Sequence, residues 1–462
     1  MKRGAALAVS AVGLFFLYFF GLTRTGLIGP DEARYAAIGR AMAATGDWIT
    51  PRLWGAAWFE KPAWLYWMTA TGFKVGLGPD WAPRLPVALA SVAFLIYFFV
   101  VLKREFGERA AWYAATILAT SAGWLAYSHI AITDLPMSAA FAAAMLMVLS
   151  VDSEPRASAS GSGMLPAPSR SRLSNGVVFI MAGGLLGIAV LAKGLVPLVL
   201  FIPALWFLRH RIRDLALLFV AAAVIGAPWY VLVSLRNGAF LQEFIWKHHF
   251  GRFLKSELQH QRPVWFYVPV LLAGLFPWTP LVPLAASPRL FRDTRAQFLL
   301  AWFAWGFVFF SISRNKLPGY LLPLLPPLAA LVGIALSENA RARILLAVCG
   351  FLLCLAPALA TMLPLALESG ISRASFHLTW PWMVAGLAIA GICAIVNRGW
   401  AVAIVALLTT VSAASLIWRV YPELDRQLSG RSAVSATCLP PTNRSQRYSL
   451  DYYAGRNLPD CK

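Results

Sequence analysis

Carboxylates and basic side chains occur together in two short segments near the start of this sequence. Residues 30–35 read Pro-Asp-Glu-Ala-Arg-Tyr, and residues 58–62 read Trp-Phe-Glu-Lys-Pro. A proline followed by two acids predicts the first turn of a helix, where negative charge is favourable. Asp31 and Arg34 would then share one helical face. Carboxylates that can act as bases, beside Lys and Arg that neutralise charge, suit a ligand that carries phosphate.

Two further charges stand alone at the ends of apolar runs. Asp134 follows Ile-Ala-Ile-Thr with no Lys or Arg in that loop, and Lys193 lies between two apolar segments. A carboxylate near a membrane boundary is costly unless it is paired or hydrated, so a functional role is the default hypothesis for Asp134. For Lys193, the functional hypothesis is a contact with phosphate.

Each of these residues also has a purely structural interpretation. Asp31 and Asp134 can each cap the start of a helix. Glu60 and Lys61 can form an exposed ion pair, which contributes about 0–1 kcal/mol. Lys193 can extend its ammonium to the membrane surface.

A third polar segment holds the histidines. Residues 246–253 read Trp-Lys-His-His-Phe-Gly-Arg-Phe, and His260 follows. Because the His-x3-His spacing of a helical zinc site is absent, this segment supports a site built of histidine alone only weakly. A last candidate segment, residues 313–320, reads Ser-Arg-Asn-Lys-Leu-Pro-Gly-Tyr.

The composition shows what kind of scaffold must position these residues. Of 462 residues, 59% are hydrophobic and 13% are charged, and the mean hydropathy is +0.66. Ordinary soluble domains have about 25% charged residues. So few polar side chains cannot cover a water-facing globule, which excludes a soluble enzyme, a disordered chain and a collagen-like fibre. The net charge of +20 must therefore lie in the loops between apolar runs.

Apolar runs of about 20 residues, the length that crosses a bilayer, predict about thirteen transmembrane helices. The predicted spans are 5–22, 84–102, 110–130, 135–151, 175–192, 194–208, 214–234, 263–286, 296–312, 318–337, 344–366, 381–397 and 399–418. Lys2 and Arg3 place the N-terminus in the cytoplasm, and alternation then gives short, basic cytoplasmic loops. A single span over 175–208 would reverse the side of every later loop, but such a helix is too long for one crossing.

This topology divides the chain into a membrane domain, residues 1–420, and a short outer tail, residues 421–462. The first outer loop, 23–83, includes an apolar stretch at 58–78 that predicts an amphipathic helix at the membrane surface. A second outer loop spans 235–262. The segment 152–174 is rich in Ser, Gly and Pro and is typical of a flexible cytoplasmic linker. All the candidate residues lie on the outer side, which predicts a single polar site there.

The motifs, taken together, resemble the lipid A aminoarabinose transferases. These are membrane glycosyltransferases of the GT-C type, related to protein O-mannosyltransferases. The resemblance covers about residues 10–335. The motifs that carry it are Pro-Asp-Glu-x-Arg-Tyr at 30–35, Gly-Asp-Trp-Ile at 46–49, Phe-Glu-Lys-Pro at 59–62, Lys193-Gly194, His249-x-x-Arg252-Phe253, His260 with Pro263-x-Trp265, Phe276-Pro277-Trp278 and Lys316-Leu317-Pro318-x-Tyr320.

The resemblance implies an all-α, polytopic GT-C fold in the bacterial inner membrane, with amphipathic helices in the first periplasmic loop. It implies transfer of a sugar from a polyprenyl-phosphate donor to a periplasmic acceptor, such as lipid A or another envelope glycan or protein. Asp31 and Asp134 correspond to functional acids. Glu60 and His249, with His248 as a competing ligand, correspond to a site for a divalent metal such as zinc, magnesium or manganese. The residues implied in holding the donor phosphate are Arg34, Lys61, Lys193, Arg252, Lys316 and Tyr320.

The tail differs from close relatives, which carry a soluble C-terminal domain after the last span, and this difference leaves the acceptor open. An oxidising periplasm would permit a disulfide between Cys438 and Cys461 in this tail. A transporter or flippase for a lipid-linked glycan is the main alternative function, and a scaffold without activity is a third. A transporter predicts charges near the bilayer midplane and inverted repeats, whereas the charges here lie in outer loops and no internal repeat is visible.

Overall fold

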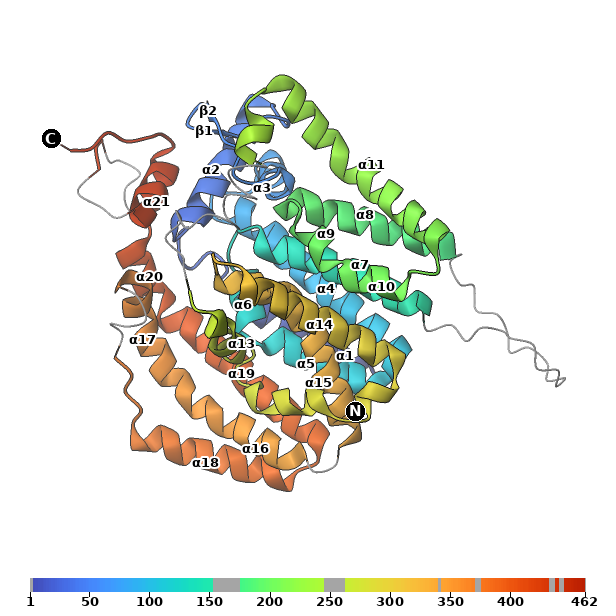
Figure 1. The fold of residues 1–462 in the computed structure, drawn as a ribbon. Helices are drawn as coiled ribbons and strands as arrows, with labels where there is room; N and C mark the ends of the chain where they lie inside the picture. Colours follow the sequence, from blue (N-terminus) through green and yellow to red (C-terminus); the bar gives the residue numbers. More distant parts are fainter. Residues whose placement is uncertain are drawn as a thin grey trace.

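The computed structural model describes residues 3–152, 175–244, 262–339, 342–369, 375–431, 437–439 and 444–461, and they form a helical bundle (Figure 1). Within these residues, the only strands are the short antiparallel pair β1 (Arg52–Leu53) and β2 (Ala56–Ala57). The all-α polytopic class predicted from the sequence is therefore confirmed. Most of the predicted linker 152–174 and much of the loop 235–262 lie outside the described residues.

Eight described helices are long and apolar enough to cross a membrane. They are Trp81–Phe106 (α4), Asp134–Val151 of α7 (Asp134–Asp152), Asn175–Lys193 (α8), Ile212–Arg236 (α11), Thr294–Ile312 (α14), Pro318–Glu338 (η5 and α15), Arg343–Leu367 (within α16, η7 and α17) and Arg398–Arg419 (α19). A ninth is reached if the bent pair Val264–Gly274 and Thr279–Ala286 is one span. The predicted number of about thirteen is thus not confirmed.

The remaining predicted spans are shorter or broken helices. The segment 110–130 divides at Ser121 into α5 (Glu108–Thr120) and α6 (Ala122–Ser128), and 194–208 divides into α9 (Val196–Leu200) and α10 (Ile202–Phe207). The first and the twelfth predicted spans form α1 (Arg3–Tyr18) and α18 (Trp380–Ile395), whose apolar parts are shorter helices. Pro197 and Pro203 stand at the starts of α9 and α10, where proline is tolerated, whereas it would break a continuous helix.

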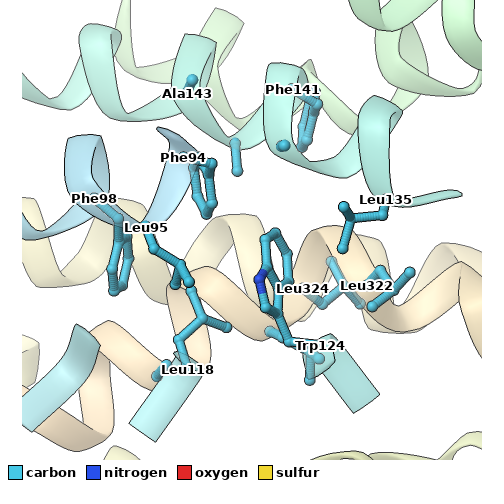
Figure 2. Close-up of a cluster of buried hydrophobic side chains, with 14 of the residues drawn as sticks. Phe94, Leu95, Phe98, Leu118, Trp124, Leu135, Phe141, Ala143, Leu322 and Leu324 are labelled. Carbon is cyan, nitrogen blue, oxygen red and sulfur yellow. The ribbon is translucent and has the colours of Figure 1, made fainter. Parts of the chain in front are cut away.

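The centre of the bundle is an apolar core around α7 and α15. Figure 2 shows aromatic and aliphatic side chains from α4, α5, α6, α7 and η5 packed together around Trp124. The buried indole nitrogen of Trp124 donates to Ser91 Oγ at 2.9 Å, so this large side chain leaves no unpaired polar group. The core places the starts of α6 and α7 firmly beside η5.

Close helix packing explains the glycines of α8. A β-carbon at Gly183 would lie 2.2 Å from the carbonyl oxygen of Leu218, and one at Gly187 would lie 2.7 Å from that of Ala222. Both contacts are with α11, so these glycines allow two backbones to approach, as small residues do in membrane helices. This supports their interpretation as packing residues rather than a nucleotide-binding loop.

The first predicted outer loop folds into two helices and the hairpin. Helix α2 (Pro30–Thr45) begins at Pro30, as predicted, and ends at Gly46 in the left-handed conformation. The predicted surface helix 58–78 forms as α3 (Trp64–Lys74), whose buried face packs against α2 and α4. The sequence did not predict the hairpin between them.

The Gly-Asp-Trp-Ile motif at 46–49 fastens this loop to the bundle. The Asp47 carboxylate accepts hydrogen bonds from the backbone of residues 49 and 50, each at 3.1 Å. The indole of Trp67 donates to the Trp48 carbonyl at 2.7 Å, and that of Trp229 donates to the Ile49 carbonyl at 2.9 Å. The motif therefore joins α2, α3 and α11 rather than supplying a reactive group.

The chain after α19 forms a small tail on the outside of α2. It comprises α20 (Tyr421–Leu428) and α21 (Arg444–Ala454), and α21 packs along α2 (Figure 1). Cys438 and Cys461 form a disulfide, with Cα atoms 4.9 Å apart, as the sequence hypothesis proposed. The disulfide ties together the chain on the two sides of α21.

A buried ion pair connects α2 to α4. Arg84 and Glu32 are each about 2% exposed, and two guanidinium nitrogens of Arg84 lie 2.7 and 2.8 Å from the Glu32 carboxylate. Arg84 also donates to the backbone carbonyls of Leu22, Thr25 and Gly26. The backbone N–H groups of Ile28 and Ala131 donate to Glu32. Such a fully bonded pair holds the chain before α2 in one conformation.

We predict that Arg84→Met lowers the free energy of unfolding by about 3–5 kcal/mol, because it leaves the Glu32 carboxylate buried without its partner. Glu32→Gln combined with Arg84→Met should cost less than the sum of the two single changes. Thermal unfolding of the detergent-solubilised protein measures both effects. The control is Lys103→Met, which removes an exposed ion pair with Glu108 and should shift the midpoint little. Equal shifts for Arg84→Met and Lys103→Met would contradict the prediction.

Candidate active site

The first group of charges lies where the start of α2 meets the segment before α3. One guanidinium nitrogen of Arg34 lies 2.5 Å from the Asp31 carboxylate and 2.9 Å from that of Glu60. The Glu60 carboxylate also lies 3.7 Å from the Lys61 ammonium. The predicted common face of Asp31 and Arg34 is therefore confirmed, and Arg34 joins the two sequence motifs into one site.

The members of this group differ in exposure. The side chain of Arg34 is 2% exposed and that of Glu60 is 11% exposed, whereas that of Asp31 is 48% exposed. A buried guanidinium between two carboxylates is held in place, because moving it would leave unpaired charge in an apolar environment. Asp31 thus offers an accessible carboxylate whose position is fixed by its buried partner.

Two buried phenols lie beside these charges. The ring centroids of Tyr35 and Tyr66 are 5.9 Å apart, and both side chains are almost fully buried. Burial raises the pKa of both phenols well above the ordinary value, and the negative charges of Asp31 and Glu60 raise it further. Both phenols therefore stay protonated at neutral pH. The Tyr66 hydroxyl has no hydrogen-bond partner among the described residues.

The second group of charges joins the start of α7 to the end of α8. The Lys193 ammonium lies 2.5 Å from the Asp134 carboxylate and 4.5 Å from the centre of the Tyr320 ring. The side chains of Lys193 and Asp134 are only 10% and 15% exposed. Lys193 is thus not a lysine that only reaches for solvent, since its charge is paired with a carboxylate and rests on an aromatic face.

Gly319 allows this second group to pack closely. A β-carbon at this position would lie 2.6 Å from an Asp134 carboxylate oxygen and 2.9 Å from the Tyr127 hydroxyl. Only glycine leaves room for both side chains at that distance. The Lys-Leu-Pro-Gly-Tyr motif at 316–320 therefore contributes a gap at Gly319 and a ring at Tyr320.

The two groups share a structural support. Tyr127 is near enough to Asp31 and Asp134 for both negative charges to act on it. Glu32, the neighbour of Asp31, accepts the backbone N–H of Ala131 at 2.9 Å, three residues before Asp134. One carboxylate thus holds the chain next to both predicted functional acids.

Among the described residues, the predicted ligand Lys316 does not join these groups. The Lys316 ammonium is buried and donates to the backbone carbonyls of Ser313 and Arg262. Burial lowers its pKa. In this structure Lys316 supports the loop before η5, and its phosphate contact stays a prediction. His249 and Arg252, with His248 and His260, lie outside the described residues.

The metal site predicted at Glu60 and His249 is likewise not tested. Among the described residues, no group of three or more His, Cys, Asp or Glu is arranged to hold a metal ion. The one predicted ligand that is described, Glu60, is engaged by Arg34 and Lys61. Because the described residues offer no complete set of ligands, we derive no step through a metal.

Sequence reasoning missed Tyr66, Tyr127 and Gly319. Tyr66 and Tyr127 stand among other aromatic and apolar residues in short helices, where an aromatic residue most often belongs to a core. Gly319 stands within the Lys-Leu-Pro-Gly-Tyr motif. The reason for a glycine there appears only in the folded chain, where Asp134 and Tyr127 lie beside it. A tyrosine next to a charged motif, such as Tyr35 after Arg34, is the one signal that could have been used.

The sequence is similar to a known family model and to curated transferases. Residues 60–160 match the family model for dolichyl-phosphate-mannose-protein mannosyltransferase, and this range includes Glu60, Lys61 and Asp134. The undecaprenyl phosphate-alpha-4-amino-4-deoxy-L-arabinose arabinosyl transferase of Erwinia tasmaniensis is 31% identical over 395 residues, which are 79% of this chain and 68% of that protein. The transferase of the same name from Pseudomonas aeruginosa (strain LESB58) is 32% identical over 352 residues, which are 74% of this chain and 61% of that protein.

Solved structures show the same fold. The crystal structure of ArnT from Cupriavidus metallidurans bound to undecaprenyl phosphate superimposes with a TM-score of 0.77 at 27% identity, covering 99% of this chain and 86% of that one. The archaeal oligosaccharyltransferase AglB from Archaeoglobus fulgidus has a TM-score of 0.54 at 13% identity, covering 99% of this chain and 64% of that one, which shows likeness of fold alone.

The chain spans about 60% of the length of the Pseudomonas aeruginosa transferase. The match to the Erwinia protein nevertheless extends over two thirds of both chains. The sequence motifs, the apolar helices and the superposition with ArnT all lead to one assignment. The chain is a multi-pass membrane protein with the GT-C fold, and it belongs to the family of the undecaprenyl phosphate-α-4-amino-4-deoxy-L-arabinose arabinosyl transferases.

Proposed function

We propose that this protein transfers a sugar from a polyprenyl-phosphate carrier to an acceptor at the periplasmic face of the bacterial inner membrane. The observation that carries the proposal is the pair of charge groups, Asp31 with Arg34 and Asp134 with Lys193, next to which the chain is held by Glu32. The relatives named as arabinosyl transferases and the neighbour bound to undecaprenyl phosphate support the class of donor. Their names favour 4-amino-4-deoxy-L-arabinose as the sugar.

The departing group in such a reaction is a lipid phosphate. Its negative charge grows as the bond to the sugar breaks, so cations that are already in place lower the barrier. Lys193 and Lys61 are mostly buried cations held near carboxylates. In our proposal they contact the phosphate oxygens, and Tyr320 forms a wall beside Lys193. Arg252 is the further cation that the resemblance adds.

Asp31 is the residue best placed to meet the acceptor. Its carboxylate is half exposed, while the contact with Arg34 fixes its direction. We assign it the role of accepting a proton from the attacking group or of orienting that group. The phenols of Tyr35 and Tyr66 remain neutral donors beside it. Asp134 holds the Lys193 ammonium, so that the cation is aimed before the donor binds.

The acceptor is the less constrained half of the proposal. Lipid A is the acceptor that the family resemblance implies, and another envelope glycan or protein is the alternative. Loss of one glycosyl mass from the envelope lipids of a deletion strain, measured by mass spectrometry, would identify the lipid acceptor. Unchanged lipids with a lost glycan on a protein would redirect the proposal to a protein acceptor.

Asp31→Asn should abolish transfer, with a loss of at least about a hundredfold in kcat, because an amide cannot accept the proton. The folding and expression of this variant should match those of the wild-type protein, since the amide keeps a hydrogen-bond acceptor for Arg34. The assay uses purified protein with an undecaprenyl-phosphate-linked aminoarabinose donor and lipid A. Near-normal turnover in a well-folded variant would sink the assigned role of Asp31.

Lys193→Ala should weaken binding of undecaprenyl phosphate by roughly tenfold or more, because a charge-assisted contact with phosphate contributes about 1.5–3 kcal/mol. The affinity is measured by titration of the detergent-solubilised protein with undecaprenyl phosphate. Lys103→Ala is the matched control. This lysine lies in the last turn of α4, where it is paired with Glu108. If both variants bind with wild-type affinity, Lys193 is not a phosphate ligand.

A further inference from the structure

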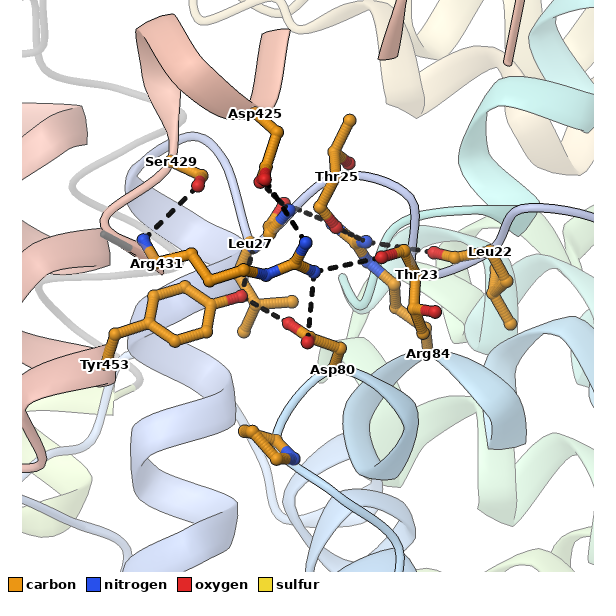
Figure 3. A network of polar contacts seen from close by, with 12 residues as sticks. Leu22, Thr23, Thr25, Leu27, Asp80, Arg84, Asp425, Ser429, Arg431 and Tyr453 are labelled. Carbon is orange, nitrogen blue, oxygen red and sulfur yellow. Dashed lines mark hydrogen bonds and ion pairs between the residues drawn. The ribbon is translucent and has the colours of Figure 1, made fainter. Parts of the chain in front are cut away.

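The tail makes a dense set of polar contacts with the chain that leads into α2. Four of its residues, which we call the tail network, take part: Asp425, Arg431, Ser449 and Tyr453. They bond to the segment 23–27 at three of its five residues, Thr23, Gly26 and Leu27 (Figure 3). All of these bonds are to backbone N–H or C=O groups of the segment. The tail network therefore holds the path of the backbone, and rotation of a side chain within the segment would not release it.

The individual contacts are short and cover both donors and acceptors. The Asp425 carboxylate accepts the Gly26 N–H at 2.5 Å, and Arg431 donates to the Thr23 carbonyl at 2.9 Å. The Tyr453 hydroxyl accepts the Leu27 N–H at 2.8 Å. Ser449 donates to the Leu27 carbonyl at 2.6 Å.

There is no spare room between the tail and this segment. A β-carbon on Gly26 would lie 2.8 Å from the Tyr453 hydroxyl and 2.8 Å from the Ser429 side chain. On the tail side, a β-carbon on Gly430 would lie 2.4 Å from the backbone nitrogen of Leu450. Such close packing means that a shift of the tail is passed on to the segment.

The segment in turn leads directly to the functional acids. Its far side is held by the Arg84 guanidinium, which is bonded to Glu32. Glu32 is the neighbour of Asp31, and it also accepts the N–H of Ala131 before Asp134. The tail network and the ion pair thus hold the same few residues from opposite sides.

The start of α2 needs this outside support. The residue at its N-terminal cap is Gly29, with φ of 81°, and it has no side chain to bond to the first turn. A glycine cap offers no side-chain oxygen to the N–H groups of the first turn, where Asp31 lies. A second contact from the tail reaches the site itself, since the Arg34 guanidinium lies 5.4 Å from the ring centre of Tyr448 on α21.

We propose that Tyr453, through its hydroxyl, is a positioning residue for Asp31 in the transfer reaction, so that the tail is a working part of the active site. The hydroxyl accepts the Leu27 N–H and donates to the Asp80 carboxylate, which itself lies 3.0 Å from Arg431. It thereby joins the tail, the segment before α2 and the start of α4 at one point. This inference rests on the proposed function, because it needs Asp31 to act on the acceptor.

Tyr453→Phe tests the proposal with the loss of a single oxygen atom. It should lower kcat roughly tenfold while KM for the donor changes less than about twofold, since a misplaced acid slows chemistry without removing the phosphate contacts. Hydrogen exchange of the backbone amides at 27–32 should become faster in the same variant. The matched control is Tyr452→Phe, which loses a hydroxyl bonded at 2.6 Å to the Pro79 carbonyl, away from the segment. It should keep wild-type kcat and wild-type exchange.

The number of undecaprenyl phosphate sites per protein, measured in each variant, corrects kcat for unfolded material. An equal loss in Tyr452→Phe and Tyr453→Phe, or a loss explained by fewer binding sites, would overturn the proposal in favour of a merely structural tail. Wild-type kcat in Tyr453→Phe would also overturn it. If the wild-type protein itself shows no transfer, the proposed function fails instead, and the exchange measurement still reports whether Tyr453 holds the segment.

Discussion

The ion pair between Glu32 and Arg84 is the interaction on which the active end of the molecule depends. Both side chains are buried, and every other bond they make is to the backbone of the segment before α2 or to Ala131. Burying two charges is costly, and the cost is offset only when geometry and additional hydrogen bonds are good. Here those additional bonds run to the chain beside Asp31 and beside Asp134. The buried ion pair therefore fixes the positions of Asp31 and Asp134, which are distant in sequence.

The apolar bundle explains why so few charges are enough. Most of the chain lies in a membrane, where exposed polar groups are unfavourable. Its charged side chains are therefore confined to loops and helix ends. Where charges are placed near one another at such an end, the surrounding apolar side chains strengthen their interactions. Arg34 between two carboxylates and Lys193 against Asp134 are pairs of this kind. They hold the cations in fixed positions, as the proposed contact with a phosphate would require.

Sequence reasoning recovered the fold class, the long apolar helices and the charged residues that pair within the two groups. It succeeded for Asp31 and Arg34 because helical spacing alone puts them on one face, and for the helix start at Pro30 because the signal is local. It failed where tertiary packing decides. The break within 110–130 depends on how short helices pack against their neighbours, and a hydropathy pattern does not contain that information. The role of Gly319 and the contacts of Tyr453 arise between segments far apart in the chain, so no local pattern could show them.

The central claim is that the paired charges at the start of α2 and the end of α8 carry out a transfer between a lipid-linked sugar and an acceptor. The most direct test uses the purified wild-type protein in liposomes that contain an undecaprenyl-phosphate-linked aminoarabinose donor and lipid A. Mass spectrometry follows both the acceptor and the released undecaprenyl phosphate. Our account predicts that the acceptor gains one sugar for each undecaprenyl phosphate released. Movement of the intact donor across the bilayer, with no sugar gained by the acceptor, would contradict it and would favour a flippase.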